Sequence, residues 1–227
     1  MKQAYEMKPV ARIQSAFPSK FGVPRQSGIV TQGEARIVFE KEFRDADAVR
    51  GLENFSHLWL IWYFSLVPPK KWSPTVRPPR LGGNTRMGVF VTRSPFRPNR
   101  IGLSSVKIER IEYSVADGPI IIVSGADLVD GTPILDIKPY LPYTDLHPDA
   151  KNGFADIDTA GRLQVEYAQG VAEKLPDDTL QVLTAVLAQD PRPSYQEDER
   201  EYGFPFEKYE VRFLVKGDKL TVIDITE

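Results

Sequence analysis

The stretch Leu58-Trp59-Leu60-Ile61-Trp62-Tyr63-Phe64 decides the fold, because seven apolar residues, four of them aromatic, follow one another without interruption. It is too short and too aromatic for a helix, so it predicts a strand buried on both faces. Around it, alternating and short apolar segments predict further strands at 35–39, 88–91, 106–111 and 119–123. No long helical connection is expected between them, only one short helix at 45–52. The predicted fold class is mainly β, with a small antiparallel β-barrel.

The composition changes after a polar stretch at 148–159. Beyond it, the pattern predicts a strand at 162–167 and a helix that Asp177 or Asp178 caps and Pro191 stops. A hairpin is expected around Gly217-Asp218. We therefore expect three parts: a β-barrel domain at 1–150, a linker at 151–159, and a small α+β C-terminal extension at 160–227.

Prolines mark two segments that are not expected to be regular. Residues 68–83 hold Pro68, Pro69, Pro74, Pro78 and Pro79 in a basic setting. So many prolines remove backbone donors, which predicts an exposed loop, and a loop of this length is typically functional or disordered. A second irregular stretch is expected where Pro133, Pro139 and Pro142 follow one another.

Several classes of protein are excluded by what the chain lacks. With no Cys and only two His, it has no disulfide framework, no thiolate nucleophile and too few ligands for a typical catalytic zinc, so no metal site is predicted. It shows neither a phosphate-binding glycine fingerprint nor a Gly-x-Ser-x-Gly motif. No apolar run approaches the roughly 20 residues that cross a bilayer. The first residues do not resemble a signal peptide, so a cytoplasmic location without membrane contact is expected.

Charge is strongly segregated along the chain. The net charge is only −2, but residues 54–108 carry nine Lys and Arg and no Asp or Glu, while the remainder holds 20 basic and 31 acidic residues. Six of the nine are Arg, whose planar fork pairs bidentately with phosphate or carboxylate. One interpretation is a basic face that pairs with the acidic remainder of the chain. The alternative, which we favour, is an anionic ligand such as RNA.

Four loops combine stiff backbone with polar side chains. They lie at 21–26, 53–58, 93–102 and 127–140, and the last of these places three carboxylates and a Lys close together. Taken alone, Asp130-Gly131-Thr132-Pro133 is also simply a good turn. Both interpretations remain open at this point, because an acid that caps a turn can still bind a ligand.

These loops carry a resemblance to a known family. The motifs FGVPRQ, VRGLENFSHLW, VRPPRLGGN, GVFVTRSPFRPN, DLVDGTPILDIKPY and AQDPRPSY stand at 21–26, 49–59, 76–84, 88–99, 127–140 and 188–195. In this order they resemble the TsaA/TrmO (YaeB-like) family. The resemblance implies a homodimeric β-barrel methyltransferase that uses S-adenosylmethionine. Its implied reaction is the methylation of N6 of threonylcarbamoyladenosine beside the anticodon, with the tRNA anticodon stem-loop as partner.

The resemblance also implies which residues form the site. It assigns cofactor binding to Pro24, Arg25, Gln26, His57, Leu58, Arg93, Asp127, Leu128, Val129, Asp130, Gly131 and Thr132. The candidates for a base that takes a proton from the acceptor nitrogen are, unranked, Asp127, Asp130, Asp136 and Tyr140. For RNA binding the candidates are Arg77, Arg80, Arg86, Arg97 and Lys138.

The residues themselves agree with these two ligands. S-adenosylmethionine carries a cation, which an acid or carbonyl groups can bind, and a carboxylate, which needs a hydrogen-bond donor. Its flat adenine needs apolar walls. The four loops contain all three kinds of group. RNA asks for arginines and aromatic platforms. Two alternatives remain: a non-catalytic RNA-binding barrel, and a metal-dependent hydrolase built on Asp127, Asp130 and Asp136.

Overall fold

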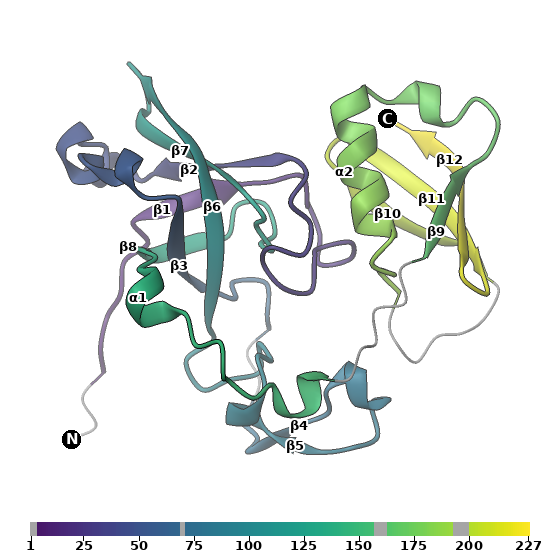
Figure 1. Ribbon diagram of the computed structural model, residues 1–227, viewed down its shortest axis with the longest axis horizontal. Helices are drawn as coiled ribbons and strands as arrows, with labels where there is room; N and C mark the ends of the chain where they lie inside the picture. Colours follow the sequence, from purple (N-terminus) through teal and green to yellow (C-terminus); the bar gives the residue numbers. More distant parts are fainter. Residues whose placement is uncertain (1–3, 69–70, 157–162, 193–199) are drawn as a thin grey trace.

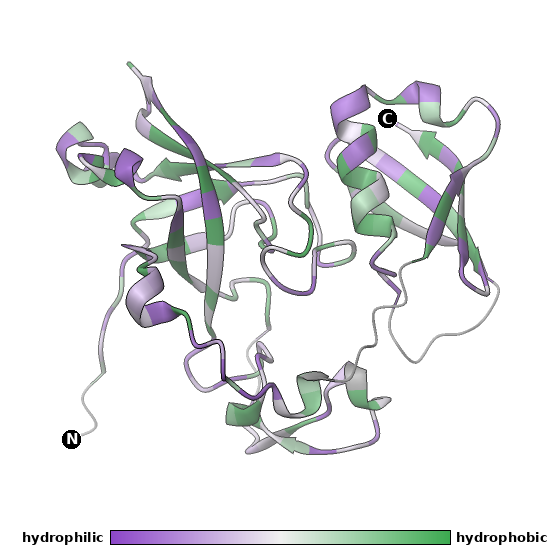
Figure 2. Cartoon of the chain, viewed as in Figure 1, coloured by the Kyte–Doolittle hydropathy of each residue, from purple (hydrophilic) through white to green (hydrophobic). Residues whose placement is uncertain are grey.

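The computed structural model describes residues 4–68, 71–156, 163–192 and 200–227. Its buried apolar residues form two separate hydrophobic cores, one inside an N-terminal sheet and one in a C-terminal unit. The two units stand beside each other (Figure 1). Strands in both alternate hydrophilic and hydrophobic residues along their length (Figure 2), so each sheet buries one face. No helix in the described part of the chain is long and apolar enough to cross a lipid bilayer.

Six antiparallel strands build the N-terminal unit, in the order β1-β2-β7-β6-β3-β8. Their bounds are β1 Ala11–Gln14, β2 Glu34–Phe39, β3 His57–Tyr63, β6 Ile101–Ser114, β7 Gly118–Ser124 and β8 Pro133–Pro139. The sheet closes because β8 pairs with β3 on one side and with β1 on the other. A mainly β fold is therefore confirmed, and its six strands enclose one apolar interior.

The strand that closes the sheet was expected to be irregular. That prediction is wrong, because the prolines of β8 stand at its two ends, Pro133 as its first residue and Pro139 as its last. Proline is compatible with a strand where the missing N–H is not needed by the ladder. The residues between them pair with β3, for example Ile137 with Leu60.

Three other local predictions also fail. In β3 burial alternates, so the strand is fully buried on one face only, the face that points into the barrel. The helix expected at 45–52 is instead two 3-10 turns, Ala46–Val49 and Leu52–Asn54, separated by Gly51 at φ 88°. The strand expected at 88–91 is only β5, Met87–Gly88, followed by the 3-10 turn Val89–Val91.

The proline-rich segment has some structure of its own. Its two-residue strand β4, Thr75–Val76, pairs with β5, and a 3-10 turn follows at Pro79–Leu81. Pro69 and Lys70 lie outside the described residues. Two other short turns are 3-10 at Lys41–Phe43 and helical at α1, Pro142–Asp145.

The C-terminal unit packs one helix, α2 (Asp177–Leu187), with a four-stranded sheet of order β10-β11-β12-β9. The bounds are β9 Gln164–Tyr167, β10 Tyr202–Phe206, β11 Tyr209–Lys216 and β12 Lys219–Thr226, with a 3-10 turn at Ala172–Lys174. The expected helix and the hairpin around Gly217-Asp218 are confirmed, but Pro176 is the N-cap and no side chain caps the helix. β10 was not predicted.

Part of the expected linker is also visible. Residues 153–156 form a 3-10 turn, Gly153–Asp156. Residues 157–162 lie outside the described part of the chain, and so do Pro193, Ser194 and Tyr195 of the last motif.

Candidate functional site

Two adjoining cavities lie among the loops of the barrel, and the larger one also reaches Pro191 and Arg192 of the C-terminal unit. The larger has a volume of about 1420 Å³ and the smaller a volume of about 690 Å³. Arg25, Gln26, Arg93 and Arg97 line both, so the two cavities share a border. The β1–β2 loop, residues 67–68 and the 91–100 loop supply this border, which brings together three segments that are separate in the sequence.

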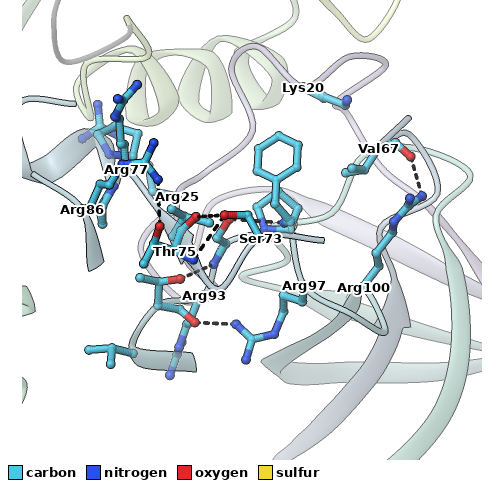
Figure 3. Close-up of a pocket in the computed structure, with 18 of the residues that line it drawn as sticks. Lys20, Arg25, Val67, Ser73, Thr75, Arg77, Arg86, Arg93, Arg97 and Arg100 are labelled. Carbon is cyan, nitrogen blue, oxygen red and sulfur yellow. Dashed lines mark hydrogen bonds between the residues drawn. The ribbon is translucent and has the colours of Figure 1, made fainter. Parts of the chain in front are cut away.

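The larger cavity is strongly basic (Figure 3). Nine cationic side chains line it, and the described residues around it include no Asp or Glu. The nine are Lys20, Arg25, Lys71, Arg77, Arg86, Arg93, Arg97, Arg100 and Arg192. Three of the residues predicted to bind RNA, Arg77, Arg86 and Arg97, are thus brought to one cavity.

Neutral oxygen atoms hold several of these cations in place. Arg97 Nη1 donates to the Thr92 carbonyl at 2.5 Å, and Arg100 Nη1 to the Val67 carbonyl at 2.7 Å. Arg86 Nη1 donates to Thr75 Oγ1 at 2.9 Å. Carbonyl and hydroxyl oxygens orient a guanidinium without neutralising its charge, so the cavity keeps a positive potential that attracts an anionic ligand.

Basic residues outside the cavity behave differently. Arg36 pairs with Glu112 at 3.3 Å, and Lys107 pairs with Glu109 at 3.0 Å. Lys138, a predicted RNA ligand, pairs with Asp136 at 2.8 Å and lines neither cavity. The pairing of basic with acidic residues therefore applies to these positions and, among the cations of the larger cavity, to Arg192, which pairs with Asp190 at 2.8 Å. The Arg80 side chain is outside the described part of the structure.

Asp127 is the only carboxylate among the described residues that line the smaller cavity. Its Oδ1 accepts a hydrogen bond from Ser104 Oγ at 2.5 Å, and Ser104 Oγ accepts one from Trp62 Nε1 at 3.0 Å. Since an indole N–H can only donate, it leaves the Ser104 hydroxyl free to donate to Asp127. The backbone N–H groups of Ser27 and of Asp127 itself donate to the same carboxyl.

Burial dominates the electrostatics of this carboxyl. Desolvation raises the pKa of Asp127 above its usual range, while the hydrogen bond from Ser104 and the backbone donors oppose the rise, as does the nearby Arg93 charge. A carboxyl of this kind, in a cavity and shifted toward neutrality, is a typical candidate for proton transfer.

Ser104 and Trp62 were not identified in the sequence. Ser104 is a buried hydroxyl at an inward position of β6, between Gly102 and Val106, which are also buried. A polar residue at an inward position of an alternating strand was the available signal, because a buried hydroxyl needs a partner.

The smaller cavity has the chemistry that S-adenosylmethionine asks for. Asp127 offers a carboxylate for a cation, and Arg93 offers a guanidinium for a carboxylate. Trp62, Phe64 and Leu103 supply apolar walls. The volume is also within the ~300–1,000 Å³ of small-molecule sites. The residues present therefore fit this cofactor.

The other predicted cofactor ligands are divided between the cavity and elsewhere. Pro24, Val129 and Thr132 line it, in addition to Arg25, Gln26, Arg93 and Asp127. Leu58 and Leu128 are buried in the barrel core, so their side chains are not accessible. Gly131 is exposed at φ 72° in a turn, and its carbonyl accepts from Arg12.

The remaining candidates for a base do not line either cavity. Asp130 is exposed, and its Oδ1 accepts a hydrogen bond from the Ser15 backbone N–H at 2.9 Å. It therefore stabilises a turn, one of the two interpretations of this motif in the sequence. Asp136 is bound to Lys138. Tyr140 lies against Trp59 and His57, with ring centroids 5.5 and 6.2 Å apart. Because Asp127, Asp130 and Asp136 have separate partners, they do not form the shared carboxylate site of a metal-dependent hydrolase.

Comparison with known proteins identifies the relatives of this chain. Residues 12–146 match the family described as tRNA-methyltransferase O N-terminal domain, and residues 160–227 match the TrmO C-terminal domain. A tRNA (adenine(37)-N6)-methyltransferase of Escherichia coli K12 is 42% identical over 222 residues, covering 93% of this chain and 94% of that protein. One from Eikenella corrodens is 48% identical over 165 residues, 72% of this chain and 92% of the relative.

A solved structure shows the same architecture. The crystal structure of TrmO from Pseudomonas aeruginosa superposes with a TM-score of 0.81 at 32% sequence identity, covering 99% of each chain. The family matches in both units and the similarity along nearly the whole chain lead to the same conclusion about the family. The chain belongs to the tRNA-methyltransferase O family.

Proposed function

We propose that this chain is a tRNA methyltransferase that transfers a methyl group from S-adenosylmethionine to N6 of threonylcarbamoyladenosine at position 37. The relatives are named for methylation of N6 of adenine 37, and one is named a putative S-adenosylmethionine-dependent methyltransferase. The observation that carries the proposal is the direct border between a cavity that fits this cofactor and a basic cavity without described carboxylates. The acceptor nitrogen of the RNA must lie next to the methyl group of the cofactor, and the two cavities adjoin at this border.

The residues at this border have different roles in the proposed reaction. When bound, S-adenosylmethionine supplies an already activated methyl group. Arg93 and Gln26 orient ligand groups at the border, while Asp127 accepts the proton that leaves N6 of the substrate. Among the four candidates for the base, Asp127 is favoured because it is the one that lines the cavity, where burial raises its pKa.

Direct binding of S-adenosylmethionine tests the proposal. We expect the purified chain to bind it in a calorimeter in the presence of a chelator. We also expect it to methylate tRNA that carries threonylcarbamoyladenosine, with the product identified by mass spectrometry of nucleosides. RNA binding without any binding of the cofactor at millimolar concentration would instead identify a non-catalytic RNA-binding barrel.

The larger cavity predicts how tRNA binding depends on salt. Removing Arg77 and Arg86 together, as Arg77→Ala/Arg86→Ala, should lower the slope of log affinity against log salt by about 1.5, since each lost phosphate contact is worth roughly 0.7–0.9. The matched control is Arg36→Ala/Arg212→Ala, which removes two arginines that pair with Glu112 and Glu201. Equal slopes for the two double variants would show that the cavity does not bind phosphate.

We further propose that the enzyme works as a homodimer with composite sites. His57 stands at the start of β3, whereas Trp62, which lines the smaller cavity, lies five residues later, about 16 Å along the strand. His57 lines neither cavity, so if it binds the cofactor, as the resemblance implies, we infer that it does so in the site of a second subunit. On the outer face, Leu103 of β6 is 54% exposed opposite Ile61 of β3 and also borders the smaller cavity, so a second copy packed on this apolar surface would reach that cavity.

A further inference from the structure

The C-terminal unit is packed directly onto the loop that leads into the cofactor cavity. Phe17 and Val30, both in the β1–β2 loop, are buried in the C-terminal core rather than in the barrel. In the same loop, the Phe21 ring lies 5.5 Å from that of Phe204 on β10. The backbone N–H of Glu207 donates to the Ala16 carbonyl at 2.9 Å. The loop is thus held by apolar and polar contacts to the second unit.

Gly22 brings the loop close to this core. It adopts φ 85°, and a Cβ built there would lie 2.4 Å from Cε2 of Phe204. Only glycine allows both this backbone conformation and this approach. Pro24, Arg25 and Gln26 follow immediately and line the smaller cavity.

Arg25 lines both cavities and also contacts the C-terminal unit. Its Nη2 donates to the backbone carbonyl of Asp190 at 3.0 Å and to that of Arg192 at 3.3 Å. Both acceptors belong to the turn after α2 in the C-terminal unit. The guanidinium of Arg25 is therefore directed at the second unit.

The turn that receives Arg25 is itself rigidly built. Asp190 has φ 50°, and its carboxylate accepts two hydrogen bonds from the Arg192 side chain, from Nε at 2.8 Å and from Nη2 at 2.9 Å. The backbone N–H of Arg192 donates to the same carboxylate at 3.2 Å. These bonds fix the direction of the two carbonyls that Arg25 needs.

On its other side the loop is tied to the groups of the cofactor cavity. Gln26 Oε1 accepts a hydrogen bond from Arg93 Nη1. The backbone N–H of Ser27 donates to the Asp127 carboxyl, and Ser27 Oγ accepts from the Ser105 N–H at 3.2 Å. Residues 25–27 therefore connect the turn of the C-terminal unit to Arg93 and Asp127.

We propose that the C-terminal unit anchors the cofactor-binding loop through the 190–192 turn, and that Arg25 is a positioning residue that acts on this turn rather than on the cofactor. This inference rests on the proposed binding of S-adenosylmethionine. It assigns to the C-terminal unit a role in cofactor affinity. It also changes the role of Arg25 from the one that the resemblance implies.

Calorimetric affinity for S-adenosylmethionine, measured on the full chain, tests the anchor. Asp190→Ala removes the carboxylate that orders the turn, and we expect the dissociation constant to rise by about tenfold. Asp190→Asn should recover most of the affinity, because Asn tolerates the left-handed conformation and still offers an oxygen to Arg192. The matched control is Asp224→Ala, which breaks an ion pair with Lys174 in the same unit at 2.7 Å and should leave the affinity unchanged.

A double-mutant cycle separates positioning from direct contact. If Arg25 acts through the turn, Arg25→Ala combined with Asp190→Ala should weaken binding no more than the larger single effect. Additive effects would show that Arg25 contacts the cofactor and would overturn the proposal, as would wild-type affinity in Asp190→Ala. If Asp190→Ala does not fold, Arg192→Ala breaks the same ion pair and takes its place. Absence of binding by the wild-type chain would instead refute the proposed function.

Discussion

Replacement of Asp127 by Asn is expected to lower the rate of methyl transfer by about 10²- to 10⁴-fold, the usual contribution of a general base. The reason is that Asn cannot accept the proton from N6, although it is similar in size. Single-turnover methylation at saturating cofactor and tRNA measures the effect. Asp117→Asn is a suitable control, because that carboxylate pairs with Arg44 at 3.2 Å and lines neither cavity. A rate within a few-fold of wild type would remove Asp127 from the role of base.

The pH profile gives the same prediction a second readout. A base works in its deprotonated form, so the rate should fall as the pH decreases through the raised pKa of Asp127, which occurs at higher pH than for an ordinary Asp. The hydrogen bond from Ser104 lowers this pKa, so Ser104→Ala should move the acid limb to still higher pH. An acid limb that does not move in Ser104→Ala would show that another group titrates.

Mixing two inactive variants should restore about a quarter of the wild-type activity if the sites are composite. In a dimer of Asp127→Asn with His57→Ala, one site receives both substitutions and the other site receives neither. At equal mixing about half of the dimers are of this kind, each with one intact site out of two. Methylation assays over a series of mixing ratios, after subunit exchange, measure the recovery.

The same experiment has clear contrary outcomes. If each subunit uses its own His57 and Asp127, neither site of the mixed dimer is intact and no activity returns. Full activity of His57→Ala alone would remove His57 from the site. A monomeric mass for the wild-type chain at micromolar concentration would exclude the composite site directly.

The sequence predicted the elements whose pattern is local. The alternation at 106–111, the apolar run at 119–123 and the helical spacing before Pro191 each became the expected element, because side-chain periodicity reports which faces are buried. It failed where an element depends on its partner. β8 pairs with both of its neighbours, β1 and β3, despite its terminal prolines. These two partners are present only because the sheet closes.

For the site, the sequence determined the kinds of side chain and the segregation of charge. The absence of acids from residues 54–108 already indicated an anionic ligand, and the loop motifs identified the family. The tertiary structure decided which of these residues meet. Arg77, Arg86 and Arg97 share a cavity, while Lys138 is held by Asp136, and Asp127 alone among four candidates lines a cavity. Spacing along the chain does not determine such distances. The burial of a side chain, its pKa and its hydrogen-bond partners depend on strands and loops that come together only in the folded sheet.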